Sequence, residues 1–374
     1  MTIRARYAGA LAALVVLLAG CGDGDPAGRP TASQSATDPA GTPSTTAPTS
    51  PSAETPHPAD DPLVLDPAPR ILDWQPIDGP VSNTVTTNGE WTLTVNQAGD
   101  RADLEGPTSA SGSGSSGERV SDAFLDDDWA VVVHQDRQEQ DPSRAVVTNL
   151  ATGKEFTIDG GSDIPTTTGG TWALGGGHLL HATIGADGSY CLASVDLTTR
   201  TSSLGWCAEK RHGFNGAHIT PFGDSLMSFD DSQPSCRTVA AVSGTQLEPL
   251  PGVTDCKGWD GVITEDGAVW SVVAKDSRVE AAHFYARSGD SYVDLGPGTS
   301  GTLTWCHGTT YFVRDPQRDG EPARLMAYDA EGLTIAYESP AGQAFLTEPR
   351  CGGDTMNVTA LAESGDEQVS AALG

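Results

Sequence analysis

Lysine and aromatic residues are scarce in this chain of 374 residues. Only 21 residues are Lys or Arg, of which four are lysines, whereas 50 are Asp or Glu, so the formal net charge at pH 7 is −29. A chain this acidic, without a lysine-rich patch, is not expected to bind nucleic acid or anionic lipid headgroups. Aromatic residues make up 6%, and the 44 Gly and 25 Pro argue against a helical bundle.

The apolar run at the N-terminus, Tyr7 to Leu18, is too short to cross a membrane as a mature helix. It follows Arg4 and Arg6, and this order is typical of a signal peptide. The run ends in Leu18-Ala19-Gly20-Cys21, which resembles the lipobox of bacterial lipoproteins.

That resemblance implies cleavage after a signal peptide of residues 1–20 and attachment of lipid to Cys21, with acyl chains such as palmitate. Loss of residues 1–20 would remove two arginines and change the net charge from −29 to −31. We therefore expect a mature protein held by acyl chains on the extracytoplasmic side of the cell membrane. An ordinary secretory signal, the alternative, would still export the chain.

Residues 21–62 are rich in Pro, Thr, Ser and Ala and carry almost no large apolar side chain. Such a segment cannot bury apolar surface, so we predict a disordered tether. Residues 63–374 form the second part, in which short β-type runs alternate with Gly, Asp, Asn and Pro turns. Within it, the Ser- and Gly-rich stretch 109–117 is expected to be a surface loop.

A repeated element organises residues 63–374: a glycine is followed at once by a strand-like run. The spacing averages about 44 residues, with one double interval in which Asp126-Asp127-Asp128 takes the place of the glycine. The glycines are Gly89, Gly177, Gly223, Gly267, Gly308 and Gly353. Five of the units show a second hairpin after this strand, which is the pattern of a four-stranded blade.

This pattern resembles the repeats of TolB-like, WD40-like and quinoprotein-like β-propellers. The resemblance implies an all-β propeller of seven blades, with six or eight as alternatives because the first two units are poorly marked. The resemblance concerns the fold and not the activity, since the regular Trp-Asp ends and repeated Trp signatures of those families are missing. Leu63 to Trp74 is expected to supply the outer strand of the last blade and so close the ring.

Six cysteines follow Cys21, an even number that indicates disulfides in an exported chain. The repeat register favours the pairs Cys191–Cys207, Cys236–Cys256 and Cys306–Cys351. A zinc site, the alternative, would need more closely spaced ligands.

Three further motifs have structural explanations that we prefer to chemical ones. Gly223-Asp-Ser-Leu226 spells the motif of GDSL-type hydrolases, but no suitable His follows it. His178 and His181 would point to opposite faces of a strand. Two acidic segments could wrap a Ca²⁺, although neither has the spacing of a calcium loop. They are Asp126 to Asp128 and the group Asp315, Asp319 and Glu321.

Ligands of propellers usually meet the innermost strands. These strands are predicted at Phe214 to Pro221, Gly258 to Thr264, Thr302 to Cys306 and Phe345 to Arg350. The candidate binding residues on them are Asn215, His218, Trp259, Asp260 and Arg350.

Two functions fit this sequence. The first is a monomeric, non-enzymatic lipoprotein whose propeller binds or scaffolds an envelope protein or a glycan, without a cofactor. The alternative is an extracellular hydrolase or lyase acting on carbohydrate or peptide. Two carboxylates facing a sugar-sized funnel would favour the enzyme, and a plugged channel with an apolar rim patch would favour binding.

The lipid anchor can be tested by the substitution Cys21→Ala. We expect the unchanged chain to fractionate with membranes and to show acyl mass at Cys21, and the variant to lose both, because acyl chains supply the attachment. Cell fractionation and mass spectrometry measure this. An unchanged chain without acyl mass would contradict the prediction.

Overall fold

A computed structural model describes residues 62–107, 110–114, 117–275, 278–340 and 342–374. All of them belong to one unit of the chain, Glu54–Gly374. The predicted signal peptide, Cys21 and all but the last residue of the tether lie outside the described residues. The described part contains 31 strands, which confirms the all-β prediction. It has no helix with the length and apolar character needed to cross a membrane.

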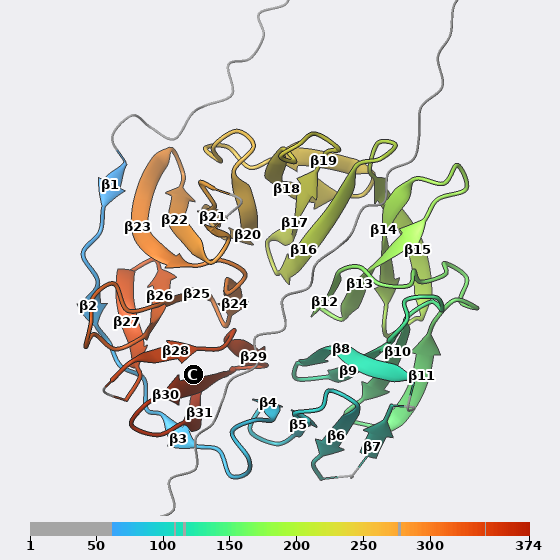
Figure 1. Cartoon of the computed structure of the whole chain (residues 1–374). Helices are drawn as coiled ribbons and strands as arrows, with labels where there is room; N and C mark the ends of the chain where they lie inside the picture. The colour runs from blue at the N-terminus through green and yellow to red at the C-terminus, as the bar shows by residue number, and fades with distance from the viewer. Residues whose placement is uncertain (1–61, 108–109, 115–116, 276–277, 341) are drawn as a thin grey trace, which may run out of the picture. The chain divides into compact units, whose positions relative to one another are not determined.

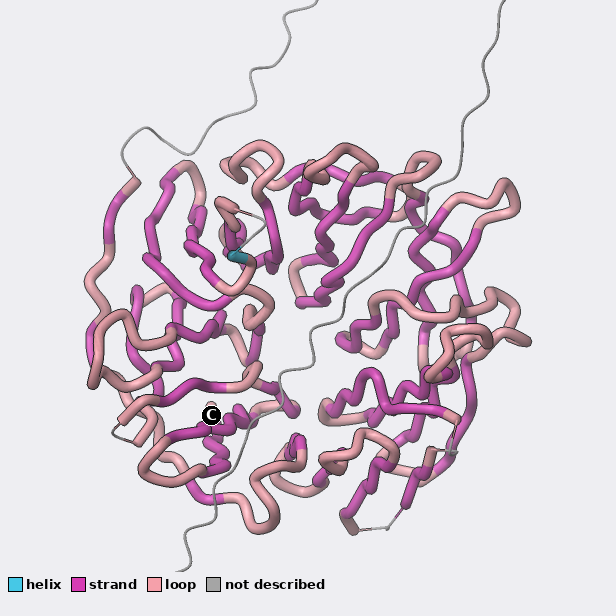
Figure 2. Tube along the Cα trace, viewed as in Figure 1, coloured by secondary structure: helices cyan, strands magenta, loops and turns pink. Residues whose placement is uncertain are grey.

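The strands form six hydrogen-bonded sheets. In the described part of residues 62–374 these sheets lie around a common centre, and in every unit except the last the first strand is nearest to that centre (Figure 1). Turns and loops connect the strands at the two ends of each sheet (Figure 2). This arrangement is a β-propeller.

Three sheets have four antiparallel strands each, in chain order from the centre outward. The first contains β4 (Thr84–Thr87), β5 (Thr92–Val95), β6 (Arg101–Glu105) and β7 (Ala110–Ser113). The second contains β12 (Trp172–Gly175), β13 (His178–Ile184), β14 (Tyr190–Asp196) and β15 (Thr201–Cys207). The third contains β16 (Gly213–Thr220), β17 (Gly223–Phe229), β18 (Arg237–Ser243) and β19 (Gln246–Pro249).

The expected surface loop at 109–117 was wrong in part, because Ala110–Ser113 pairs with β6 as strand β7. Backbone pairing places this segment in a sheet although its Ser and Gly residues have little strand propensity.

Two further sheets have four strands of their own and a fifth that comes from the N-terminal segment. One contains β20 (Gly258–Thr264), β21 (Gly267–Val272), β22 (Ala281–Ser288), β23 (Ser291–Thr299) and β1 (Leu63–Val64). The other contains β24 (Thr304–Cys306), β25 (Thr309–Arg314), β26 (Arg324–Asp329), β27 (Gly332–Glu338) and β2 (Ala68–Pro69).

The sixth sheet has nine strands. It contains β8 (Glu118–Leu125), β9 (Trp129–Asp136), β10 (Arg144–Asn149), β11 (Lys154–Ile158), β28 (Ala344–Leu346), β29 (Arg350–Gly352), β30 (Thr355–Ala362), β31 (Glu367–Ala372) and β3 (Gln75–Pro76).

The prediction of seven separate blades was therefore wrong. Five sheets are separate blades of four or five strands, and the sixth unites the second and last units of the sequence repeat. These two units join because β29 pairs in parallel with β8 at Gly352 and Leu125.

Each repeat glycine lies at the turn between the first and second strands of its unit, as the repeat predicts. Gly308 has a φ of +85°, a conformation that L side chains rarely adopt. At Gly267 a Cβ atom would lie 2.0 Å from the carbonyl oxygen of Arg287. The glycines therefore mark positions where the backbone turns sharply or a neighbouring strand approaches closely.

Residues 62–77, which we call the strap, run along the outer edges of three successive units. β1 and β2 pair in parallel with β23 and β27, and β3 pairs antiparallel with β31. The strand that closes the last unit is therefore Gln75–Pro76, just beyond the predicted Leu63 to Trp74. The strap covers backbone edges that would otherwise be open to pairing with another chain.

Most of the hydrophobic core lies between neighbouring sheets. Phe284 of β22 and Phe312 of β25 are fully buried and stack with their ring centroids 4.2 Å apart. The junction of the first and last units is different, because none of the described core clusters spans it. There Asn357 exchanges hydrogen bonds with the backbone of Thr87, and the Gln368 side chain donates to the carbonyl of Asn83.

The structure contains the three disulfides expected from the repeat register. Cys191–Cys207 joins opposite residues of β14 and β15, and Cys236–Cys256 encloses the β18–β19 hairpin. Cys306–Cys351 links the inner strands β24 and β29 of neighbouring units.

Trp74 ties the strap to the propeller, which gives a test of its contribution to stability. Its indole donates a 2.8 Å hydrogen bond to the carbonyl of Ala336 and meets the Tyr337 ring edge to face. We expect Trp74→Ala to lower the free energy of unfolding by about 2–3 kcal/mol. Ile71→Ala, at a strap residue that is 52% exposed, should cost less than about 0.5 kcal/mol. Urea unfolding measures both, and equal losses would show that the strap is not anchored through Trp74.

Candidate functional site

The inner strands converge on a central cavity of about 500 Å³. Residues of β4, β8, β12, β16, β20, β24 and β29 line it, so every unit of the repeat contributes. Its volume lies within the range of pockets that hold small ligands. We call it the central cavity.

All five residues that the sequence analysis proposed for binding line the central cavity: Asn215, His218, Trp259, Asp260 and Arg350. On two of the inner strands, a shift in strand register lies beside these residues. The pairing of β16 with β17 shifts between Asn215 and His218, and that of β20 with β21 shifts between Gly258 and Gly261. Such bulges change the direction of side chains locally.

Asp260 is the most deeply buried acid of the cavity, with 4% of its surface exposed. Its Oδ2 accepts a 3.0 Å hydrogen bond from the backbone N–H of Gly301, and its Oδ1 accepts a 3.3 Å bond from Ser271 Oγ. Burial is the largest of the effects that raise its pKa to about 7, and the negative charge of Glu348 adds to it. The carboxyl group of Asp260 therefore titrates near neutral pH.

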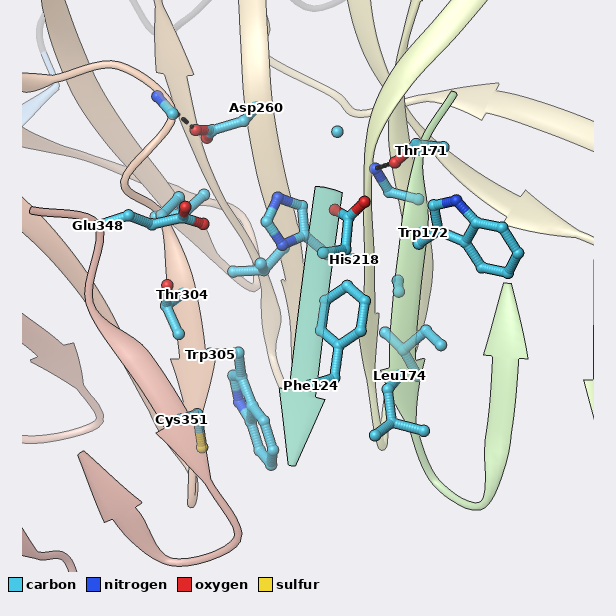
Figure 3. A pocket seen from close by; sticks show the side chains of 18 of the residues that line it. Phe124, Thr171, Trp172, Leu174, His218, Asp260, Thr304, Trp305, Glu348 and Cys351 are labelled. Carbon is cyan, nitrogen blue, oxygen red and sulfur yellow. Dashed lines mark hydrogen bonds between the residues drawn. The ribbon is translucent and has the colours of Figure 1, made fainter. Parts of the chain in front are cut away.

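The structure adds two acids that the sequence analysis did not single out, Asp122 and Glu348. Burial is the main cause that raises the pKa of each, and Asp122 repels the charge of Glu348. Glu348 keeps more than a third of its surface accessible, although protein atoms surround it, because its side chain faces the cavity (Figure 3). The Arg350 guanidinium favours the ionised form of both acids.

Of these two acids, only Glu348 had a signal in the sequence. Glu348 lies two residues before Arg350, and alternate residues of a strand share a face. The predicted strand Phe345 to Arg350 is in fact broken between β28 and β29, and Glu348 lies in that break. Asp122 lies at a register shift of β8 that no glycine marks.

His218 and Trp259 complete the polar lining. Burial lowers the pKa of His218 to about 4, so its imidazole is neutral at physiological pH. Trp259 has the guanidinium of Arg237 over its ring, 4.8 Å from the centroid. This cation–π contact occupies one face of the indole.

A second cavity of about 540 Å³ lies at the junction of the first and last units. Residues of β4 and β30 line it, and it shares Glu348 and Arg350 with the central cavity. The side chains of Glu348 and Arg350 therefore line both cavities.

The other motifs of the sequence have structural roles here. Ser225 is buried, and its hydroxyl donates a 2.6 Å hydrogen bond to the carbonyl of Gly261, which leaves it no role as a nucleophile. His181 is buried against the Trp172 ring, whereas His178 contacts Asp224. These two histidines bind different partners.

The acidic segments considered for Ca²⁺ also stabilise turns. Asp126 accepts hydrogen bonds from the backbone N–H groups of Asp128 and Trp129. Asp315 accepts from the Thr299 hydroxyl, and Glu321 from the backbone of Gln317. In the described part of the chain, no group of three or more His, Cys, Asp or Glu side chains is placed to hold a metal ion.

The sequence matches no protein-family model, and a search of curated proteins finds no match. Solved structures are similar in fold. Prolyl oligopeptidase B from Galerina marginata is 8% identical with a TM-score of 0.50, and the match covers 78% of this chain and 49% of that one. Acylaminoacyl peptidase of Pyrococcus horikoshii is 11% identical with a TM-score of 0.45, covering 68% and 45%. The β-propeller domain of the trilobed protease from Pyrococcus furiosus is 10% identical with a TM-score of 0.43, covering 68% and 81%.

At these identities the similarity shows the fold alone, and the chain spans about half the length of the first two peptidases. The protein is a β-propeller, as its sheet topology also shows.

The buried carboxyl of Asp260 predicts a specific pH dependence of stability. Because the folded state holds this proton more tightly than the unfolded chain, its stabilising contribution is lost as pH rises from about 4 through about 7. Between pH 5 and pH 8 the unchanged protein should lose on the order of 2 kcal/mol more stability than Asp260→Asn.

Urea unfolding at the two pH values measures this difference, and the titration of other groups cancels in the comparison. Asp290→Asn, at an exposed turn between β22 and β23, is the matched control and should follow the unchanged protein. A parallel pH dependence of Asp260→Asn and the unchanged protein would contradict the prediction.

Proposed function

We propose that this protein is a non-enzymatic binding module of the cell envelope, whose central cavity takes up part of an envelope protein or a glycan. The observation that carries the proposal is the cavity itself. Inner strands of every unit meet there, and aromatic and ionisable side chains line one hollow of about 500 Å³. A few polar groups set in an apolar lining are typical of ligand sites.

The envelope location rests on the sequence. The lipobox resemblance of Leu18 to Cys21 supports export and a lipid anchor, and residues 21–62 would separate the propeller from the membrane. The acidic surface fits a protein that is attached by acyl chains rather than by contact with anionic headgroups. We propose that it acts there as a monomer.

A second candidate, a hydrolase or lyase acting on carbohydrate or peptide, is favoured by the feature that the sequence analysis expected of an enzyme, carboxylates that face an unplugged cavity. The cavity is open and holds three acids, and Asp260 retains a proton near neutral pH, as a general acid must. Against it, both oxygens of Asp260 accept hydrogen bonds from the fold, which is typical of a structural carboxyl. Turnover of a glycan or peptide library that stops in Asp260→Asn would favour the enzyme.

The binding function is tested by filling the cavity. Asn215 lines it and has an exposed side chain, so Asn215→Trp should fold normally and obstruct the site. On arrays of envelope glycans and peptides we expect the unchanged chain to bind and this variant to bind at least about tenfold more weakly.

Gln138→Trp adds the same side chain to an exposed loop that does not line the cavity, and it should bind like the unchanged chain. Equal binding by the two variants would place the ligand elsewhere. No binding by the unchanged chain would refute the proposed function.

A further inference from the structure

We propose that the ligand of the central cavity is an organic cation, an ammonium or guanidinium group attached to an apolar or aromatic body. This inference rests on the proposed function, because it names the chemistry of the ligand that the same cavity would take. It follows from the charges that face the cavity and from their position along it.

The ionisable lining is predominantly acidic. Asp122, Asp260 and Glu348 face the cavity together with a single arginine, Arg350. Arg119 acts on Asp122 but does not line the cavity. His218 contributes no positive charge at neutral pH because burial lowers its pKa. The cavity therefore carries a net negative charge that attracts cations and repels anions.

The single positive charge of Arg350 does not neutralise all three carboxyl groups. Its Nη1 donates a 3.0 Å hydrogen bond to the carbonyl of Ala123, which directs part of the guanidinium to the backbone of β8. Glu348 points into the cavity, and Figure 3 draws no hydrogen bond to its carboxylate from the residues shown. Glu348 and Asp260 also repel one another. A positive group placed between them would relieve that repulsion.

His218 is an independent sign of a ligand that donates hydrogen bonds. Its ring lines the cavity and is partly exposed there, and it forms no hydrogen bond with another described side chain or carbonyl. A neutral imidazole has one nitrogen that accepts a hydrogen bond. An ammonium or guanidinium group supplies donors both to this nitrogen and to the carboxylates.

Figure 3 shows that the cavity has two chemically different ends. Asp260, His218 and Glu348 lie at one end, which we call the polar end. Phe124, Leu174 and Trp305 lie at the other, the aromatic end. Phe222, 43% exposed, meets the Trp305 ring edge to face with centroids 6.4 Å apart and extends this apolar surface. The body of the ligand packs against the aromatic end while its charge lies at the polar end.

Three indole compounds of similar size and shape differ in charge, so they test whether charge determines binding. Tryptamine is a cation, tryptophol is neutral and indole-3-propionate is an anion. Calorimetric titration of the full chain at pH 7.5 measures their affinities. We expect tryptamine to bind at least about tenfold more tightly than tryptophol, and indole-3-propionate to bind most weakly. Asn215→Trp should abolish binding if the compounds occupy the cavity.

The charge of Glu348 is tested by Glu348→Gln, which keeps the shape of the side chain. We expect it to weaken tryptamine binding about tenfold and to leave tryptophol binding unchanged. Glu363→Gln, at an exposed turn outside the cavity, makes the same change in net charge and should leave both affinities unchanged. An equal effect of the two variants would overturn the proposal, because it would reflect only the overall charge of the protein.

The outcomes distinguish this inference from the proposed function. If all three compounds bind equally in the cavity, the binding function stands and the preference for cations is refuted. If none binds while the arrays yield a neutral or anionic ligand that Asn215→Trp blocks, the inference alone fails. If neither the compounds nor the arrays yield a ligand, both proposals fail.

Discussion

The fold is stabilised mainly by burial of the two apolar faces of each β-sheet. A single four-stranded sheet cannot bury both of its faces, and most sheets here pack against their neighbours through apolar side chains, as the stacked rings of Phe284 and Phe312 illustrate. The junction of the first and last units, which polar hydrogen bonds connect, is the exception. Sheets that satisfy this requirement in succession return to their starting point, which brings their inner strands to one centre. The central cavity is thus a direct consequence of how the sheets bury their faces.

The same geometry explains the electrostatics of the cavity. Inner strands bring polar side chains from distant parts of the chain into a space where water is limited, and burial there raises the pKa of Asp122, Asp260 and Glu348. Register shifts at Asp122, at His218 and around Asp260 coincide with this polar lining. The irregular parts of otherwise regular strands therefore carry the chemistry that a ligand would meet.

Local features of the sequence predicted much of this. Turn glycines marked the strand hairpin of every unit except the second, and cysteine positions within the repeat predicted three disulfides. The inner-strand assignment placed Asn215, His218, Trp259, Asp260 and Arg350 on one cavity. Glu348 was missed because it lies in a break of the predicted strand, and strand β7 was missed because Ser and Gly have little strand propensity of their own. Whether a segment forms a strand, and where that strand breaks, depends on the strand that pairs with it.

The sequence by itself determined the all-β class, the repeat, the turns and the disulfide pairs, because these depend on periodicity and on residues close to one another in each unit. Only the tertiary structure decided how the units join. It united β8 with β29 in a single sheet, spread the strap over three units and assembled three acids around one cavity. Pairing of strand edges and the meeting of charges across the centre are long-range interactions, and no local pattern records which distant segment will supply the partner.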